Sequence, residues 1–356
     1  MLESECSDAL AKLEQRLGAE WGHLREAREL SRSTFESVMS RASEECLDSE
    51  DTSIVVMGSL ARGEFTAGSD IDWYLLIDGS ADPRHHDLFR RAGQVLDPIA
   101  AKMPGQEGTF GSMVFSHGLI HHIGGDDDTN LNTTRRLLLL LESRVAGRSE
   151  AWQRVIRSIL VRYIGEDCGL WKGSGKRVPH FLLNDLTRFW RTMAVDFAYK
   201  LRNRGGKGWA IRNIKLRMSR KLIYVAGLLT CYSCHLEQAG IHGGETDPEA
   251  LRERVLAHLE QRFSQTPLEN IAGMLVRHPH LDGSARKIFD SYDEFVGMLA
   301  NADKRNQLER LTIDGMEGDA VFERARELSH VFRDGLIELF FDSASGLESL
   351  TKGGIV

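Results

Sequence analysis

Two aspartates separated by one residue, Asp70 and Asp72, lie at the start of an apolar segment that ends at Ile77. In a β-strand, side chains at positions i and i+2 point to the same face, so both carboxylates would converge on one spot. Carboxylate oxygens bind Mg²⁺ or Mn²⁺, and such an ion can bridge triphosphate oxygens and offset the charge that develops at a transferred phosphorus. The spacing therefore predicts a site in which Asp70 and Asp72 are both the metal ligands and the catalytic residues.

A glycine-serine turn precedes the two aspartates. Residues 54–57 are apolar and mostly β-branched, which predicts a buried strand, and Gly58 allows a tight turn where this strand ends. We expect a helix to begin beside Ser59, because main-chain N–H groups at a helix N-terminus next to a small hydroxyl can bind a phosphate. The alternative is an ordinary turn followed by two solvated aspartates. The turn, its connector and the start of the second strand follow in order within fifteen residues, which favours the phosphate site.

Residues 54–78, with their Gly-Ser turn and Asp-x-Asp pair, resemble the DNA polymerase β-like nucleotidyltransferase superfamily. The Arg-Gly-Glu connector at positions 62–64 is similar to that of the bacterial PII uridylyltransferases and related nucleotidyltransferases. Antitoxin and aminoglycoside nucleotidyltransferases carry similar connectors. The resemblance implies that Gly58 and Ser59 bind the triphosphate of a nucleotide and that Asp70 and Asp72 hold the metal.

The connector leaves two alternatives open. Arg62 either belongs to the nucleotide-binding residues or forms a pair with Glu64 that ties the turn to the sheet. Ser69 either contacts the nucleotide or caps and orients Asp70. The family pattern alone does not decide between these roles.

Many members of the superfamily have a third carboxylate on a later strand, which helps to deprotonate the attacking hydroxyl. This sequence has no clean equivalent; the candidates are Asp126, Asp127 and Asp128, of which Asp126 is our choice of metal ligand. At least one of them could lie near the first pair if residues 119–125 form a strand, although three acids after Gly-Gly are also typical of a solvated turn. A weaker likeness to the uridylyltransferase branch covers residues 123–126 and 138–144.

Composition favours a cytoplasmic enzyme over a small binding module. The chain has 356 residues, 42% hydrophobic and 27% charged, which is enough for two or three packed units. Its formal net charge of -7 gives no general argument for nucleic-acid binding, because proteins that coat phosphate backbones are usually basic. The longest purely aliphatic run, residues 137–141, is too short to span a bilayer, and no secretory leader is apparent, so we expect no membrane association.

Five scattered cysteines argue against a disulfide framework. Cys231, Cys234 and His235 match the short haem-attachment pattern, and the cysteine pair matches half of a zinc site. The segment continues the apolar run at residues 222–229 and has no second cysteine pair nearby. We therefore expect a core helix and no haem.

The resemblance implies an α+β fold: a polymerase-β-like nucleotidyltransferase core, made of a small mixed sheet with helices, followed by a mostly α-helical domain. The periodicity divides the chain into a helical lead-in (1–48), a catalytic domain (49–129), a helical domain with a basic cluster (130–238) and a C-terminal helical region (239–356). The clearest predicted helices cover residues 85–103, 137–141, 152–164, 181–201 and 214–229.

Nine basic residues and no acidic one lie between positions 200 and 221: Lys200, Arg202, Arg204, Lys207, Arg212, Lys215, Arg217, Arg220 and Lys221. The cluster is either a solvated face or a site for the triphosphate or an anionic acceptor such as RNA. On the second interpretation Lys215, Arg220 and Lys221 bind the nucleotide. Asp185 lies three positions before Arg188 in a predicted helix, and it either contacts the sugar or base of the nucleotide or pairs with that arginine.

These patterns predict a metal-dependent nucleotidyltransferase, with Mg²⁺ or Mn²⁺ as cofactor and an NTP as substrate. It would transfer a nucleoside monophosphate to a hydroxyl of a protein or RNA acceptor and release pyrophosphate. A small-molecule acceptor, as in antibiotic modification, is a second possibility. The competing hypothesis is a noncatalytic nucleotide-binding protein, regulatory or antitoxin-like, that retains the fold without the chemistry.

Overall fold

The computed structural model describes residues 9–45, 47, 49–99, 110–171, 176–203, 206 and 208–355. The chain divides into two compact units, each assembled from segments that are distant in the sequence. The sheet unit contains Glu26–Cys168 and Pro248–Thr266, and the helical unit contains Met1–Arg25, Gly169–Asp247 and Pro267–Val356. The domain boundaries expected from periodicity, after residues 48, 129 and 238, stay predictions.

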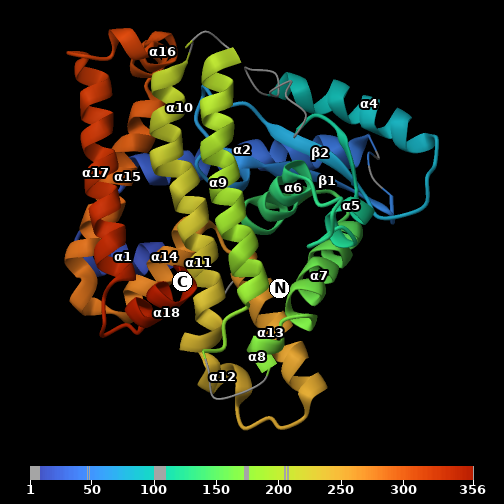
Figure 1. Cartoon of the computed structure of the whole chain (residues 1–356). Helices are drawn as coiled ribbons and strands as arrows, with labels where there is room; N and C mark the ends of the chain where they lie inside the picture. The colour runs from blue at the N-terminus through green and yellow to red at the C-terminus, as the bar shows by residue number, and fades with distance from the viewer. Residues whose placement is uncertain are drawn as a thin grey trace. The chain divides into compact units, whose positions relative to one another are not determined.

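Among the described residues of the sheet unit, four short strands form one mixed sheet (Figure 1). They are β1 (Thr52–Met57), β2 (Asp72–Ile77), β3 (Met113–Phe115) and β4 (Ser143–Ala146), in the spatial order β3-β2-β1-β4. β1 is antiparallel to both β2 and β4, whereas β2 and β3 are parallel. This small mixed sheet, with its helices and the helical region that follows, confirms the predicted α+β fold.

Helices connect and cover the strands. In chain order they are α2 (Gly22–Glu44), whose first residues belong to the helical unit, α3 (Gly58–Arg62), α4 (Arg84–Leu96), η1 (Asp97–Ile99), α5 (Ser116–Ile120), α6 (Asn130–Leu141), α7 (Glu150–Gly165) and α13 (Pro248–Phe263). Arg157 of α7 forms ion pairs with Glu253 and Glu260, which attach α13 to the sheet unit. A segment about eighty positions further along the chain thus completes this unit.

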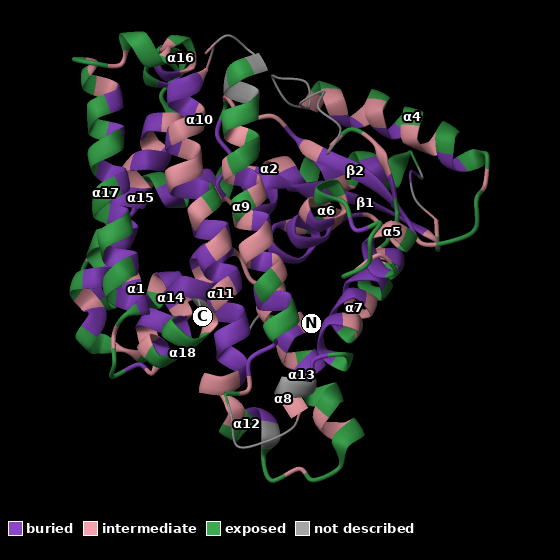
Figure 2. Cartoon of the chain, in the orientation of Figure 1, coloured by how far each residue is buried: buried purple, intermediate pink, exposed green. Residues whose placement is uncertain are grey.

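The alternation of side chains along β2 divides the sheet into two faces. Ile71, Trp73 and Leu75 join residues of β1, α2 and α4 in one continuous core, drawn purple in Figure 2. Tyr74 is fully buried and points to the other face, on which α7 packs against β1 and β2. Each large apolar side chain that is buried in this way stabilises the fold by about 1.5–3 kcal/mol. Asp72 shares the face of Tyr74 and so projects away from the α2–α4 core.

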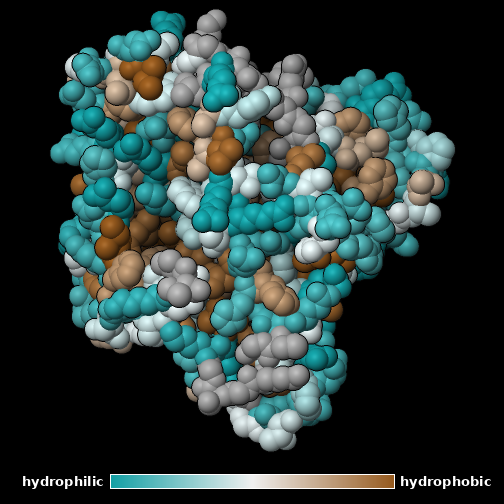
Figure 3. Space-filling model, viewed as in Figure 1, coloured by the Kyte–Doolittle hydropathy of each residue, from teal (hydrophilic) through white to brown (hydrophobic). Residues whose placement is uncertain are grey.

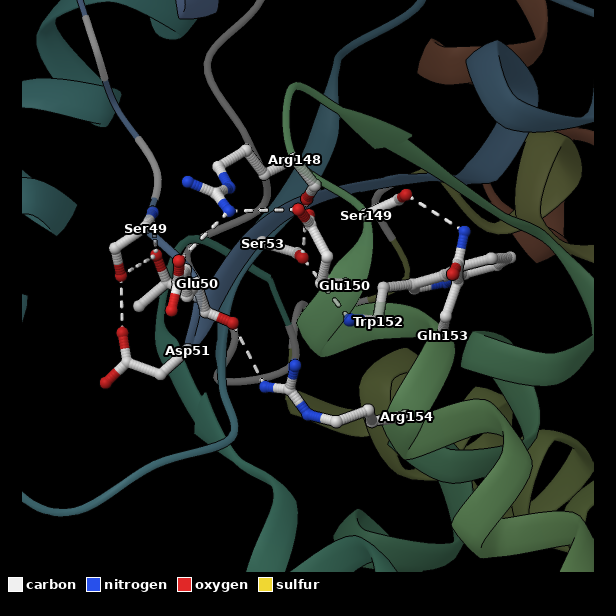
Figure 4. Close-up of polar contacts among 11 residues, drawn as sticks. Ser49, Glu50, Asp51, Ser53, Arg148, Ser149, Glu150, Trp152, Gln153 and Arg154 are labelled. Atoms are coloured by element: carbon white, nitrogen blue, oxygen red, sulfur yellow. Dashed lines mark hydrogen bonds and ion pairs between the residues drawn. The ribbon is translucent and has the colours of Figure 1, made fainter.

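The first half of β1 is tied to the start of α7 (Figure 4). The Ser53 hydroxyl donates a hydrogen bond of 2.7 Å to the Arg148 carbonyl and accepts one of 3.3 Å from the Trp152 main-chain N–H. These contacts fix the strand before it reaches its last residue, Met57. The turn at Gly58 therefore begins from an anchored position.

Two sequence interpretations of this unit are corrected by the structure. Residues 119–125, for which a strand was one of two alternatives, form the end of α5 and the turns after it, with Gly124 at φ +74°. The second catalytic strand begins at Asp72, two residues later than expected, because Asp70 forms only an isolated β-bridge. The helix predicted over residues 85–103 is present as α4 and η1 up to Ile99, and its remainder lies outside the described residues.

The helical unit contains the remaining helices: α1 (Ala9–Leu17), α8 (Cys168–Trp171) at the boundary between the units, α9 (His180–Asn203), α10 (Trp209–Lys215), η2 (Leu216–Arg220), α11 (Lys221–Leu236), α12 (Gln238–His242), α14 (Pro267–Arg277), η3 (Pro279–Leu281), α15 (Asp282–Ala300), α16 (Ala302–Arg310), η4 (Ile313–Gly315), α17 (Ala320–Phe340) and α18 (Leu347–Ile355). The predicted helices at 181–201 and 214–229 are confirmed. The π-helical turn η2 joins α10 to α11, so the main chain stays helical through most of the basic cluster.

Aromatic side chains form part of the core of the helical unit. Tyr292 lies 5.4 Å from Phe295 and 5.5 Å from Phe332 between ring centroids, and these three residues join α15 to α17. Cys231 and Cys234 are buried on α11, which confirms the predicted core helix. Across the described ranges, no helix combines the length and the apolar character needed to cross a membrane.

Candidate active site

The glycine turn at the end of β1 lies directly against Asp72. Met57, the last residue of β1, is opposite Asp72 in the register of the sheet. The next residue, Gly58, has φ +68°, and a Cβ atom added there would lie 2.8 Å from Oδ2 of Asp72. The left-handed conformation costs an L-residue about 1–2 kcal/mol, and the carboxylate leaves no room for a side chain. Both reasons require glycine at this position.

The two aspartates flank a buried residue. Ile71 is 1% exposed and belongs to the α2–α4 core, whereas Asp70 and Asp72 on either side of it are half-buried. Because neighbouring side chains of an extended segment point to opposite faces, both carboxylates project away from that core. This supports the expectation that they share one accessible site.

The donor set fits a hard divalent cation. Mg²⁺ is usually held by one or two carboxylates and completes its shell with water and substrate phosphates, and Asp70 and Asp72 supply two carboxylates, of which Asp72 lies against the turn at Gly58. Within the described ranges, no group of three or more His, Cys, Asp or Glu side chains is arranged to hold a metal ion. Asp70 and Asp72 as the two protein ligands of a cation stay a prediction.

The three acids proposed to supply a third carboxylate lie in different environments. Asp126 and Asp127 are exposed in the turns after α5. Asp128 is buried and forms an ion pair of 2.8 Å with the fully buried Arg136, which also donates a hydrogen bond of 2.7 Å to the Tyr163 hydroxyl. Asp128 therefore neutralises the arginine that links α6 to α7, and Asp126 lies exposed in a turn.

A buried ionic network lies at the end of the short helix α3. The Arg62 side chain is only 8% exposed and donates to Oε2 of Glu64 at 3.0 Å and to Oε2 of Glu142. Glu142 directly precedes β4, which pairs with β1. Oε1 of Glu64 is buried and has no hydrogen-bond partner among the described residues. These contacts favour the structural alternative for Arg62 and Glu64, in which they tie the glycine turn to the sheet.

Glu142 is the residue that the sequence interpretation missed. It lies within residues 138–144, whose likeness to the uridylyltransferase branch assigns no role to this acid. The available signal was an acid directly before a short strand. In the structure Glu142 is the carboxylate that a later strand brings to the Arg62 network.

The two serines have different local partners. Ser59 is half-buried in α3, and its carbonyl accepts a hydrogen bond of 2.8 Å from the Glu64 N–H. Ser69 is buried, and its hydroxyl accepts a hydrogen bond of 3.1 Å from the Thr66 N–H. Ser69 thus closes the turn that leads into Asp70. Contact of either serine with a nucleotide stays a prediction.

The other predicted nucleotide-binding residues belong to the helical unit. Asp185 is half-buried on α9, Lys215 ends α10, Arg220 ends η2 and Lys221 begins α11. Burial, together with the nearby charges of Arg217 and Arg333, lowers the pKa of Lys221. Two further residues of the basic run, Arg204 and Lys207, lie outside the described residues, as does the side chain of Lys200. The structure thus brings Gly58, Ser59, Arg62, Ser69, Asp70 and Asp72 together in one unit and describes this second group in the other.

Comparison with known families agrees with the geometry of the sheet unit. Residues 39–103 match the model of the family described as the nucleotidyltransferase domain. The matched segment includes β1, the glycine turn, both aspartates and α4. This part of the chain is similar to a nucleotidyltransferase domain, which is consistent with the resemblance to the polymerase β-like superfamily. A search of curated proteins gave no significant match to the chain.

Proposed function

We propose that the protein is a metal-dependent nucleotidyltransferase that transfers a nucleoside monophosphate from an NTP to an acceptor hydroxyl on a protein or RNA. The observation that carries the proposal is the contact between the glycine turn and Asp72, where a Cβ atom would come within 2.8 Å of the carboxylate. It lies inside the segment that matches the nucleotidyltransferase domain. The contact puts a carboxylate that can bind a cation directly beside the glycine-serine turn, in which Gly58 is buried and Ser59 is half-buried.

The residues of the sheet unit have different roles in the proposed reaction. Asp70 and Asp72 would hold Mg²⁺ or Mn²⁺ through their carboxylate oxygens, and a cation held there would supply positive charge to offset that of the triphosphate. Gly58 and Ser59 bind the triphosphate. Arg62 holds the turn that contains them in position through its ion pairs with the buried Glu64 and Glu142.

The reaction is an in-line displacement at the α-phosphorus. The acceptor oxygen forms a bond to the α-phosphorus as the bond to the bridging oxygen breaks. Pyrophosphate leaves with that oxygen, and the proton of the acceptor hydroxyl passes to solvent. Holding the two reactants in this alignment supplies a large part of the rate enhancement.

The test follows label from each α-³²P NTP, with Mg²⁺ or Mn²⁺, into a host lysate that is then separated into protein, RNA and small molecules. Asp70→Asn and Asp72→Asn should each reduce transfer at least about 100-fold, because several kcal/mol of charge stabilisation is lost. Asp87→Asn is the matched control, since Asp87 is exposed on α4 and pairs only with Arg90 three residues later within the described chain. Activity that survives both site variants, with folding intact by circular dichroism, rules out the proposed chemistry.

One observation favours a second candidate function, a noncatalytic nucleotide-binding protein. Of the acids proposed to help deprotonate the acceptor hydroxyl, Asp126 is exposed in a turn and Asp128 is paired with Arg136. Metal-dependent NTP binding that depends on Asp72, without any release of pyrophosphate, would support this second function. Label in one fraction of the lysate that vanishes in both variants would exclude it and would identify the class of acceptor.

A further inference from the structure

The helical unit contains a cavity of about 800 Å³ that lies between α9, α11, α17 and α18. This volume is in the range of about 300–1,000 Å³ that is typical of small-molecule sites. Figure 3 shows apolar side chains gathered in a hollow between α17 and α11, above α18. All the lining residues belong to the same compact unit, so the cavity is a property of that unit alone.

One wall of the cavity is apolar and aromatic. Trp190 of α9 and Tyr224 of α11 are stacked, with ring centroids 5.3 Å apart and an angle of 17° between their planes. On α17 and just after it, Ile337 is 49% exposed and Phe341 is 47% exposed, although both are large apolar residues. Exposed apolar surface that lines a concave site marks a place where a ligand binds.

The charged residues of the cavity all have the same sign. Arg191, Lys221 and Arg333 line it, and no Asp or Glu is among its described lining residues. Arg333 also forms a half-exposed ion pair of 2.7 Å with Asp334, which does not line the cavity. The absence of acids is informative because the chain as a whole has 52 acidic and 45 basic residues. A binding site lined by one sign of charge selects ligands of the opposite sign.

Lys221 is the cation that the fold leaves most clearly uncompensated. It is half-buried, and among the described residues it forms no ion pair. Its charged neighbours Arg217 and Arg333 have the same sign, and together with burial they lower the pKa of Lys221. A half-buried ammonium with like charges around it is stabilised when an anion binds beside it.

We propose that this cavity binds a small aromatic anion. The anionic group lies beside Lys221 and Arg333, and the aromatic body lies against the Trp190–Tyr224 stack and the apolar residues of α17. The proposal concerns a second site and does not depend on nucleotidyl transfer in the sheet unit.

The experiment compares two fluorescent probes that differ in charge: 8-anilinonaphthalene-1-sulfonate, an aromatic anion, and its uncharged analogue N-phenyl-1-naphthylamine. Each is titrated into the full-length protein. The sulfonate should bind saturably at one site. Lys221→Gln and Arg333→Gln should each weaken its binding about fivefold, the upper end for a partly exposed charge pair, and should leave binding of the uncharged probe unchanged.

Two further variants separate this site from nonspecific binding. Leu228→Trp, which places a larger side chain in the cavity wall, should weaken both probes. Arg326→Gln should weaken neither, because Arg326 is an exposed residue of α17 that does not line the cavity. Near-ultraviolet circular dichroism of every variant checks that the fold is retained. The proposal is overturned if the sulfonate does not saturate, if the two charge variants bind it as tightly as the wild type, or if they lose both probes equally.

Discussion

Two buried arginines of the sheet unit and one lysine of the helical unit have opposite electrostatic surroundings. In the sheet unit, Arg62 and Arg136 are buried and lie within ion-pair distance of carboxylates. In the helical unit, Lys221 is half-buried beside other cations and has no carboxylate partner within the described chain. A cation that is neutralised inside the protein contributes to the position of the backbone, whereas a cation that is left without a counter-charge is available to a ligand. On this comparison, Arg62 and Arg136 have a structural role, whereas Lys221 belongs to a binding surface.

The largest expected effect is a loss of stability when Arg62 is replaced, and it tests the structural role of the buried arginines. Arg62→Met leaves Glu64 and Glu142 buried without their cation, and we expect the free energy of unfolding to fall by about 3–5 kcal/mol. Urea denaturation measures the loss. Arg90→Met is the control, because Arg90 forms an exposed pair with Asp87 and its removal should cost less than about 1 kcal/mol. Equal effects of the two substitutions would mean that the Arg62 network is not structural.

The glycine turn supported by that network gives the next largest effect. Gly58→Ala combines the cost of φ +68° with the approach of Cβ to Asp72, whereas Gly124→Ala has a similar φ of +74° and nothing within 4 Å. We expect Gly58→Ala to cost about 1–3 kcal/mol more than Gly124→Ala, as is typical of overpacking. It should also abolish nucleotidyl transfer. Comparison of the two unfolding curves isolates the contact with Asp72, and equal stability of the two variants would show that the carboxylate moves aside freely.

Glu64→Gln tests whether the network needs both of its carboxylates. Two carboxylates surround one guanidinium, and Oε1 of Glu64 has no partner among the described residues. The amide oxygen can still accept the hydrogen bond from Arg62, so we expect the free energy of unfolding to change by less than about 1 kcal/mol. A loss as large as that of Arg62→Met, measured in the same urea titration, would mean that the charge of Glu64 is required.

The smallest expected effect is a gain in stability when Lys221 is replaced, and it tests the inference that this lysine has no counter-charge in the folded protein. Because the pKa of Lys221 is lowered in the folded protein, its protonated form opposes folding. Lys221→Met should therefore raise stability at neutral pH, by about 0.5 kcal/mol after allowance for solvent screening. The gain should shrink as the pH rises through the folded pKa towards the ordinary value for lysine. Unfolding measured at neutral and alkaline pH tests this trend, and a loss of stability at neutral pH would contradict it.

The parts of the site that sequence reasoning predicted are those that depend on local pattern. The apolar run before Gly58 forms β1, and the family model covers both aspartates. Their immediate neighbours determine these features: a β-branched run favours a strand, and only glycine adopts the turn that follows without strain.

The parts that could not be predicted depend on residues far apart in the chain. Glu142 pairs with Arg62 across a separation of 80 residues, and no periodicity reveals such a contact. The strand considered before Asp126 does not form, for a different reason. Short apolar runs do not distinguish a strand from a short helix such as α5, and the glycines after it form turns.

The division of the chain also constrains the order in which the protein can assemble during synthesis. The polypeptide passes from one unit to the other after Arg25, Cys168, Asp247 and Thr266. A nascent chain that has emerged only as far as Cys168 carries β1 to β4 and both aspartates but lacks α13, with which Arg157 pairs. The sheet unit can therefore be completed on the ribosome only after a large part of the helical unit has been translated, because Gly169–Asp247 precedes Pro248–Thr266 in the chain.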